Sequence, residues 1–173
     1  MDNMALFALL LFAVIVGVII SIIAISATNN DKKLKTKYDE RQQAARGKSF
    51  AWGFYTALIA SGILTVLSPT GWIDFLGHYG YFVVIVLAVI VQFTYAVFHD
   101  AYLGLNTNLK KYMIFMTIVS VINLASSIAG IVNGEIMVDG VLQTPFMNLL
   151  CTVMFVVLAV DLGIKAIIDK KEA

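Results

Sequence analysis

Five apolar segments alternate with shorter polar stretches along the chain. They cover approximately residues 4–26, 51–68, 80–98, 112–132 and 146–168. A helix rises about 1.5 Å per residue and the hydrocarbon core of a bilayer is about 30 Å thick, so segments of this length suit membrane crossing. The pattern predicts an all-α integral membrane protein, a bundle of five transmembrane helices that forms a single domain over residues 1–173.

The first apolar segment, residues 4–26, has a cleaved signal peptide as its alternative interpretation. Ala24 and Ser26 supply small residues near a cleavage point. However, the amino terminus Met-Asp-Asn-Met carries no basic residue, and the apolar run exceeds the roughly 7–15 residues of a signal-peptide core. We therefore predict that this segment is retained as the first crossing.

Two connectors carry structural signals of their own. Residues 70–79 contain Trp72 and Tyr79 without any lysine or arginine, which predicts an interfacial loop with a short helical turn. In residues 133–145, Asp139-Gly140 is flanked by Ile, Val and Leu, which predicts a small β-hairpin.

Composition agrees with the membrane class and narrows the chemistry. The chain is 60% hydrophobic and 13% charged, with a mean hydropathy of +0.89, whereas soluble domains are about a quarter charged. A single cysteine excludes a disulfide scaffold. The sequence has no phosphate-binding glycine motif, paired-cysteine metal motif or haem-attachment motif, and His78 and His99 are expected on opposite sides of the membrane. No cofactor or metal is predicted.

The distribution of positive charge predicts the orientation. Of the 12 Lys and Arg residues, seven lie between the first and second segments, two between the third and fourth, and three from Lys165 onward. Basic residues are retained on the cytoplasmic side of membranes. The amino terminus is therefore expected outside and the carboxyl terminus in the cytoplasm.

The basic segment 30–50 is the main candidate for a functional surface. Leu34, Tyr38 and Ala45 recur at helical spacing between basic residues, which predicts a cytoplasmic amphipathic helix between the first two transmembrane helices. Such a helix either lies on the anionic inner leaflet or docks a partner. The segment is too short and too close to the membrane to indicate nucleic-acid binding. The candidate partner-binding residues are Tyr38, Asp39, Glu40, Arg41, Arg46 and Lys48.

The same residues carry a resemblance to a known group of proteins. Tyr38-Asp39-Glu40-Arg41-Gln42, followed by Arg46-Gly47-Lys48 and an aromatic helix start, resembles the "YDERQ…RGK" segment that precedes a membrane helix in small, uncharacterised multi-spanning proteins of Gram-positive, mainly clostridial-type bacteria. The resemblance covers about 20 of the 173 residues. It implies a bacterial cytoplasmic-membrane setting and transfers no chemistry.

Four polar residues inside the apolar segments are candidates for intramembrane roles, because a polar group in lipid costs free energy unless it is paired. Asp161 and Lys165 are four residues apart and are expected to form an ion pair near the inner interface, with a proton or cation site at Asp161 as the alternative. Gln92 and Asn123 lie near the middle of their segments and are expected to bridge neighbouring helices or to line a substrate cavity.

Together these features favour a non-enzymatic accessory, sensory or regulatory membrane protein that engages a partner through its basic segment. The expected partners are the lipid bilayer and a membrane or cytoplasmic protein, a second copy of the chain included. The alternative is a small carrier or substrate-binding component with a cavity lined by Gln92, Asn123 and Asp161. A membrane-embedded enzyme acting on lipid is a third hypothesis, for which the sequence supplies no catalytic residue.

Overall fold

The computed structural model describes residues 3–172, which form five α-helices, two short 3-10 helices and one β-hairpin. The α-helices are α1 (Asn3–Thr28), α2 (Glu40–Leu67), α3 (Gly80–Phe98), α4 (Leu109–Val132) and α5 (Thr144–Glu172). The all-α prediction is confirmed, and the bounds of α3, α4 and α5 lie within a few residues of the predicted segments.

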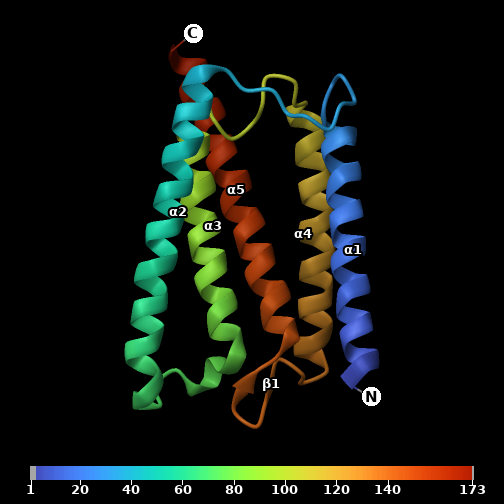
Figure 1. Ribbon diagram of the computed structural model, residues 1–173, viewed down its shortest axis with the longest axis vertical. Coiled ribbons are helices and arrows are strands. Elements are labelled where there is room, and N and C mark those ends of the chain that lie inside the picture. Colours follow the sequence, from blue (N-terminus) through green and yellow to red (C-terminus); the bar gives the residue numbers. More distant parts are fainter. Residues whose placement is uncertain (1–2, 173) are drawn as a thin grey trace.

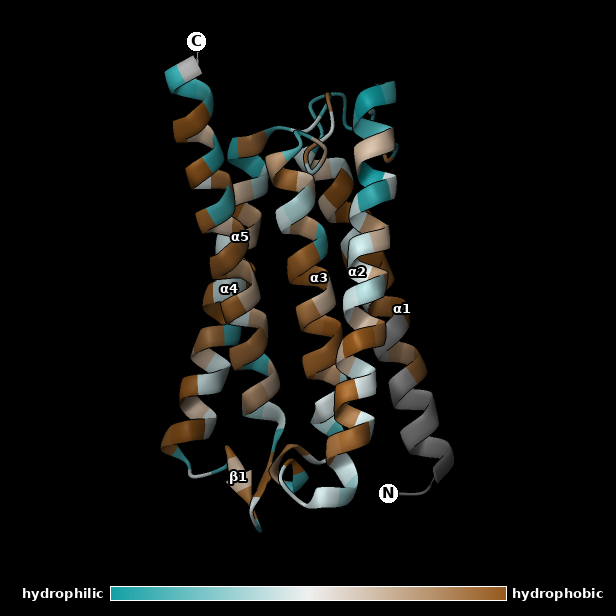
Figure 2. Cartoon of the chain, turned by 90° about the vertical axis from the view of Figure 1, so that its left-hand side faces the viewer, coloured by the Kyte–Doolittle hydropathy of each residue, from teal (hydrophilic) through white to brown (hydrophobic). Residues whose placement is uncertain are grey.

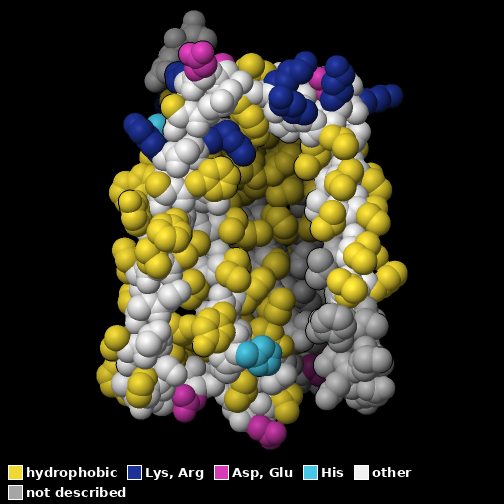
Figure 3. Space-filling model, viewed as in Figure 1, with side chains coloured by type: hydrophobic (Ala, Val, Ile, Leu, Met, Phe, Trp, Pro, Cys, Tyr) yellow, Lys and Arg dark blue, Asp and Glu magenta, His cyan; other side chains and the backbone are white. Residues whose placement is uncertain are grey.

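The helices run up and down and form a curved row (Figure 1). Within it, α2 packs against α3, α3 against α5 and α5 against α4, while α1 packs along α4. Both α1 and α2 stand forward of the other helices, as the side view in Figure 2 shows. An open depression, called here the front hollow, lies between α1 and α2 over α3, α4 and α5, and apolar side chains line it (Figure 3).

Among the described residues, four helical stretches are long and apolar enough to cross a membrane: Glu40–Thr70, Asp74–Phe98, Leu109–Val132 and Thr144–Lys171. Their apolar side chains point outward to an extent that water would disfavour. Ile59 of α2 is 65% exposed, Val66 of the same helix 73% and Val132 of α4 79%. The α1 helix has 26 residues, of which the apolar stretch with described side chains is Ile15–Thr28. The remaining side chains of the predicted first crossing lie mostly outside the described part.

The predicted separate amphipathic helix between the first two transmembrane helices is wrong. Residues 30–39 form an irregular loop, and Glu40–Phe50 is the first part of α2 itself. The helix begins at Glu40 because Asp39 and Gln42 form a capping box: the Asp39 carboxylate accepts from the backbone N–H of Gln42, and the Gln42 side chain accepts from that of Asp39. No proline interrupts the chain until Pro69, so α2 extends to Leu67.

The short helical turn predicted in residues 70–79 and the predicted β-hairpin are both confirmed. Short 3-10 helices, η1 (Ser68–Thr70) and η2 (Asp74–Tyr79), join α2 to α3. Strands β1 (Met137–Val138) and β2 (Val141–Leu142) pair antiparallel. The turn between them has positive φ at Asp139 (49°) and Gly140 (78°), the conformation that favours Asp-Gly at this place.

The helix row is held by a small buried core and by close approaches at small residues. Phe93 and Val97 of α3 pack with Leu158 of α5, and all three are buried. At Gly53 of α2, a Cβ atom would lie 3.1 Å from the Cβ of Gln92 and 3.2 Å from the carbonyl oxygen of Ala88, so α2 and α3 nearly touch there. Small residues permit such backbone approach between membrane helices.

All the Lys and Arg residues lie toward one end of the molecule, called here the basic end. It comprises the α1–α2 loop, the first turns of α2 and α4, the α3–α4 loop and the last turns of α5. Figure 3 shows them at the top, on the side where the C-terminus lies. The acidic residues Asp74, Glu135 and Asp139 lie at the opposite end, on η2 and around the hairpin.

Candidate functional site

At the basic end, the α1–α2 loop and the α3–α4 loop are joined into one structure, called here the cap (residues 28–39 and 99–108). Asn29 and Thr107 form a β-bridge. The backbone N–H of Asn30 donates to the carbonyl of Asn106 (2.8 Å), and that of Asn108 donates to the carbonyl of Thr28 (2.9 Å). The two loops therefore pair through their backbones, although they are almost 80 residues apart in sequence.

The side chain of Asn106 is the centre of the cap. Its Oδ1 accepts from the backbone N–H of Lys37 (2.8 Å), and its Nδ2 donates to Oδ1 of Asp31 (3.0 Å) and to the carbonyl of Lys35 (3.2 Å). The hydrogen bond from Asn106 lowers the pKa of Asp31, and Lys33 and Lys37 add to this effect against the opposing effect of desolvation. Asp31 is therefore ionised at neutral pH, and its Oδ2 lies 3.2 Å from Nζ of Lys37.

Gln42 joins α2 to the α3–α4 loop. Its side chain is buried, and its Nε2 donates to the carbonyl oxygen of Asp100 at 2.6 Å and to that of Leu103 at 3.4 Å. The predicted partner residue Asp39 is exposed but engaged, because its Oδ1 accepts from the backbone N–H of Gln42 at 2.7 Å. These contacts fix the first turn of α2 relative to the cap.

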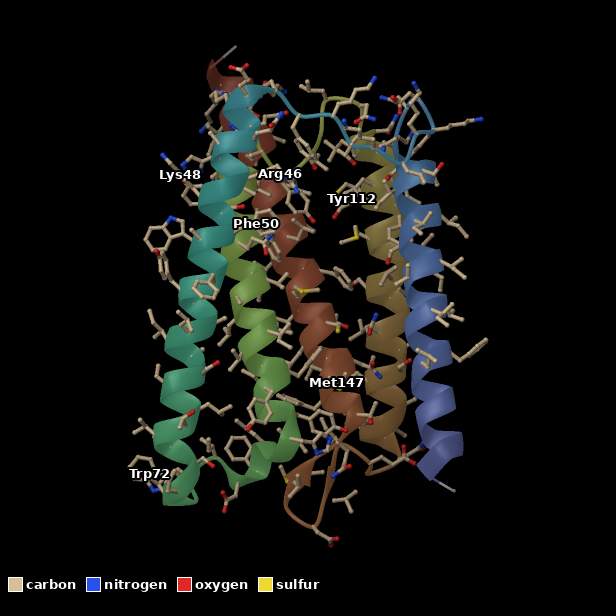
Figure 4. The ribbon with its side chains drawn as sticks, viewed as in Figure 1. Arg46, Lys48, Phe50, Trp72, Tyr112 and Met147 are labelled. Atoms are coloured by element: carbon tan, nitrogen blue, oxygen red, sulfur yellow. The ribbon has the colours of Figure 1, made fainter. Side chains whose placement is uncertain are left out.

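Tyr38 and Arg46, both predicted to bind a partner, contact each other. Nη1 of Arg46 donates to the hydroxyl of Tyr38 (2.9 Å) and, more weakly, to the carbonyl of Ala101 (3.4 Å). The guanidinium carbon lies 4.1 Å from the centroid of the Tyr38 ring and 5.7 Å from that of Phe50. Figure 4 shows Arg46 and Phe50 pointing from α2 toward the middle of the molecule. Both Tyr38 and Arg46 are half-buried.

Glu40, Arg41 and Lys48, the other predicted partner residues, are exposed. Arg41 makes an ion pair with Asp100 at 3.4 Å, with 74% of its side chain accessible. Within the described residues, Glu40 and Lys48 form no ion pair. Lys48 and Arg41 line a shallow groove with Ala44, Ala45, Tyr95, Phe98, His99 and Asp100. Of the predicted set, Tyr38 and Arg46 are thus half-buried and in contact, Asp39 and Arg41 are exposed but have partners, and Glu40 and Lys48 are exposed without an ion pair among the described residues.

The expected ion pair between Asp161 and Lys165 is replaced by other contacts. Oδ2 of Asp161, which is buried, accepts from the hydroxyl of Thr94 on α3 at 2.6 Å. Nζ of Lys165 lies 2.9 Å from Asp100 and 2.6 Å from Asp169. Asp100 follows the end of α3 and has a φ of 56°. Its carboxylate lies between Lys165 of α5 and Arg41 of α2 and forms an ion pair with each.

Gln92 and Asn123 do not meet. Gln92 faces Gly53 at the contact between α2 and α3. Nδ2 of Asn123 donates to the carbonyl of Val119 in its own helix (2.8 Å), so the expected bridge to a neighbouring helix is absent for this residue among the described hydrogen bonds. Local bonding of this kind already satisfies a polar side chain in an apolar environment.

Sequence reasoning missed two features of this end. The first is the pairing of Asn29 with Thr107 and of Asn30 with Asn106, which only tertiary structure creates. The second is the contact between the hydroxyls of Tyr102 in the α3–α4 loop and Tyr112 in α4. The side chains of both tyrosines also pack against the buried core. Burial raises the pKa of Tyr102; Tyr112 and Arg46 oppose this shift, whereas Tyr38 adds to it. The hydroxyls of Tyr102 and Tyr112 thus form a second contacting pair at this end, beside that of Tyr38 and Arg46.

Comparison of the chain with protein-family models, with curated proteins and with solved structures gives no match. Within residues 3–172, no group of three His, Cys, Asp or Glu side chains is placed to hold a metal ion.

Proposed function

We propose that this protein is an integral membrane protein of five crossings, with its amino terminus outside and its basic end in the cytoplasm. The four long apolar helices and the outward-facing apolar side chains support membrane insertion. The collection of Lys and Arg at one end supports the orientation. The resemblance of residues 38–48 to a bacterial membrane-protein segment supports placement in a bacterial cytoplasmic membrane.

Within that setting, we propose a non-enzymatic accessory or regulatory role in which the cap binds a partner protein. The observation that carries this proposal is the difference between engaged and exposed polar groups in the cap and the first turns of α2. Hydrogen bonds of Asn106, Gln42 and Asp39 fix their shape internally. The remaining charged groups stay exposed: Lys32, Lys33, Lys35, Glu40, Arg41 and Lys48.

A pre-formed loop structure with outward charges suits recognition of a partner, because little conformational entropy is lost when it binds. Electrostatic complementarity then selects the partner and speeds association. The cationic excess of this surface favours a partner with an acidic cytoplasmic face, and the exposed Glu40 marks a position at which a basic group of the partner would fit.

The carrier hypothesis finds less support in the geometry. It requires Gln92, Asn123 and Asp161 to line one cavity, but they occupy separate contacts: the α2–α3 approach, the backbone of α4 and the hydroxyl of Thr94. Each already has a local structural role.

The test is a charge exchange at the exposed residues. E40K/R41E preserves the net charge of +1 but reverses the local pattern, so we expect a partner that co-purifies with the tagged wild type from native membranes to be lost. K171E/E172K is the matched control, because it exchanges two adjacent charges at the same end and should retain the partner. Equal retention by both variants, with unchanged melting temperatures, would contradict the proposal.

A further inference from the structure

We propose that the front hollow holds an anionic phospholipid of the surrounding leaflet, with its phosphate at Arg46 and Tyr38. This site differs from the exposed charges assigned to the protein partner, since it faces the middle of the molecule rather than the outer surface of the cap.

The first support is the state of the Arg46 guanidinium. It is half-buried under the cap, and among the described residues it contacts no carboxylate. Only Nη1 is engaged, with the Tyr38 hydroxyl and the Ala101 carbonyl. Because a guanidinium carries five N–H donors, most of its hydrogen-bonding capacity is free for an anion. Arginine suits phosphate because its planar fork can donate two parallel hydrogen bonds.

The second support is the orientation of the side chain, which Tyr38 and Phe50 determine. The ring of Tyr38 lies against the guanidinium at 4.1 Å and restricts its rotation. Phe50, one turn further along α2, is 52% exposed and presents an apolar face below the charge. In Figure 4 the side chains of Arg46 and Phe50 point from α2 toward the middle of the molecule, and Tyr112 approaches the same region from α4.

The third support is the apolar lining of the helices that face the hollow. A groove of about 210 Å³ is lined by residues of α4 and α5. Its lining is almost entirely apolar: Met113, Met116, Val121, Phe155, Val156 and Leu158, with Thr117, Ser120 and Ala159. Figure 3 shows basic side chains at the rim of the hollow and hydrophobic ones inside it. A cation above an apolar channel is complementary to a phosphate above an acyl chain.

The half-buried guanidinium of Arg46 has no carboxylate partner among the described residues, and an opposite charge stabilises a cation that is partly withdrawn from water. Phosphatidylglycerol supplies a phosphate diester with one negative charge and no cation of its own. Phosphatidylcholine carries the same phosphate beside a quaternary ammonium. The proposal therefore predicts preference for the first lipid over the second.

The experiment measures binding of both lipids to the full-length protein in a neutral detergent, by native mass spectrometry and by the shift of melting temperature. We expect phosphatidylglycerol to bind wild type more tightly than phosphatidylcholine, and R46Q to lose about tenfold in affinity for it, the effect of one charge-assisted hydrogen-bonding group. Inorganic phosphate at millimolar concentration should not compete, since it lacks the acyl chain.

K48Q is the matched control. It removes the same charge from the same helix two residues away, at the groove shared with His99 instead of at the front hollow. Equal losses for R46Q and K48Q, or no preference between the two lipids, would overturn the site. If R46Q does not fold, R46K and Y38F test the proposal instead. R46K keeps the positive charge but loses the planar guanidinium, and Y38F keeps Arg46 but loses the hydroxyl that it contacts. Unchanged lipid affinity in both variants would overturn the proposal.

Failure of this test leaves the protein-partner proposal intact, and the reverse also holds. E40K/R41E changes the exposed first turn of α2 beside the cap and should retain lipid preference, whereas R46Q should retain the co-purifying protein. A bound protein helix in place of lipid, displaced by R46Q, would contradict the lipid assignment.

Discussion

At the scale of single residues, charged side chains that are neighbours in sequence have different roles. Asp39, Glu40 and Arg41 are consecutive, yet Asp39 caps a helix, Glu40 is exposed and Arg41 pairs with Asp100. A cap residue stabilises the fold through hydrogen bonds to backbone N–H groups that otherwise have no partner. Changes at Asp39 should therefore affect stability before they affect recognition.

The first prediction concerns Asp39 as the N-terminal capping residue of α2. D39A removes the acceptor for the Gln42 N–H and should lower the free energy of unfolding by about 1 kcal/mol. D39N retains a side-chain oxygen, so its free energy of unfolding should lie within a few tenths of a kcal/mol of the wild-type value. Unfolding in mixed micelles, followed by circular dichroism, measures both. Equal stability of D39A and wild type would show that helix capping by Asp39 contributes nothing to the free energy of unfolding.

At the scale of elements, contact between α2 and α3 depends on one glycine. A side chain at Gly53 would meet Gln92 and the backbone of Ala88, whereas at Gly62 of the same helix nothing lies within 4 Å. Two glycines in one helix thus have opposite environments. Dispersion contacts and close backbone approach supply much of the attraction between membrane helices, so only the first position should be sensitive to size.

The second prediction compares these two positions. G53L should separate α2 from α3 and cost roughly 1–3 kcal/mol, the usual range for overpacking. G62L points into open space and should be neutral or slightly stabilising, because leucine favours helix over glycine. Thermal denaturation in detergent distinguishes them, and a loss of stability in G62L as large as that in G53L would contradict the packing described here.

At the scale of the whole molecule, the apolar segments predicted the helices well because a membrane-crossing helix needs a long run of apolar residues and little else. The start of α2 was misplaced because its basic first turns resemble a separate amphipathic helix. The correct signal was present in Asp39-Glu40-Arg41-Gln42, whose first and fourth residues form the capping box.

Other parts of the site had no local signal. Lys165 and Asp161 are one turn apart, but Lys165 bonds Asp100 and Asp169, and Asp161 bonds Thr94. Which partner a long side chain chooses depends on helices brought together by folding. The pairing of Asn29 with Thr107 is likewise a product of the up-and-down arrangement, which places both loops at the same end.

The proposed orientation is the claim on which both binding proposals depend, and single-cysteine labelling tests it most directly. In a C151S background, which removes the only native cysteine, E135C reports on the hairpin end and K33C on the exposed surface of the cap. An impermeant maleimide should label E135C in intact cells, and K33C only after the membrane is opened. Labelling of K33C in intact cells, with E135C protected, would contradict the account.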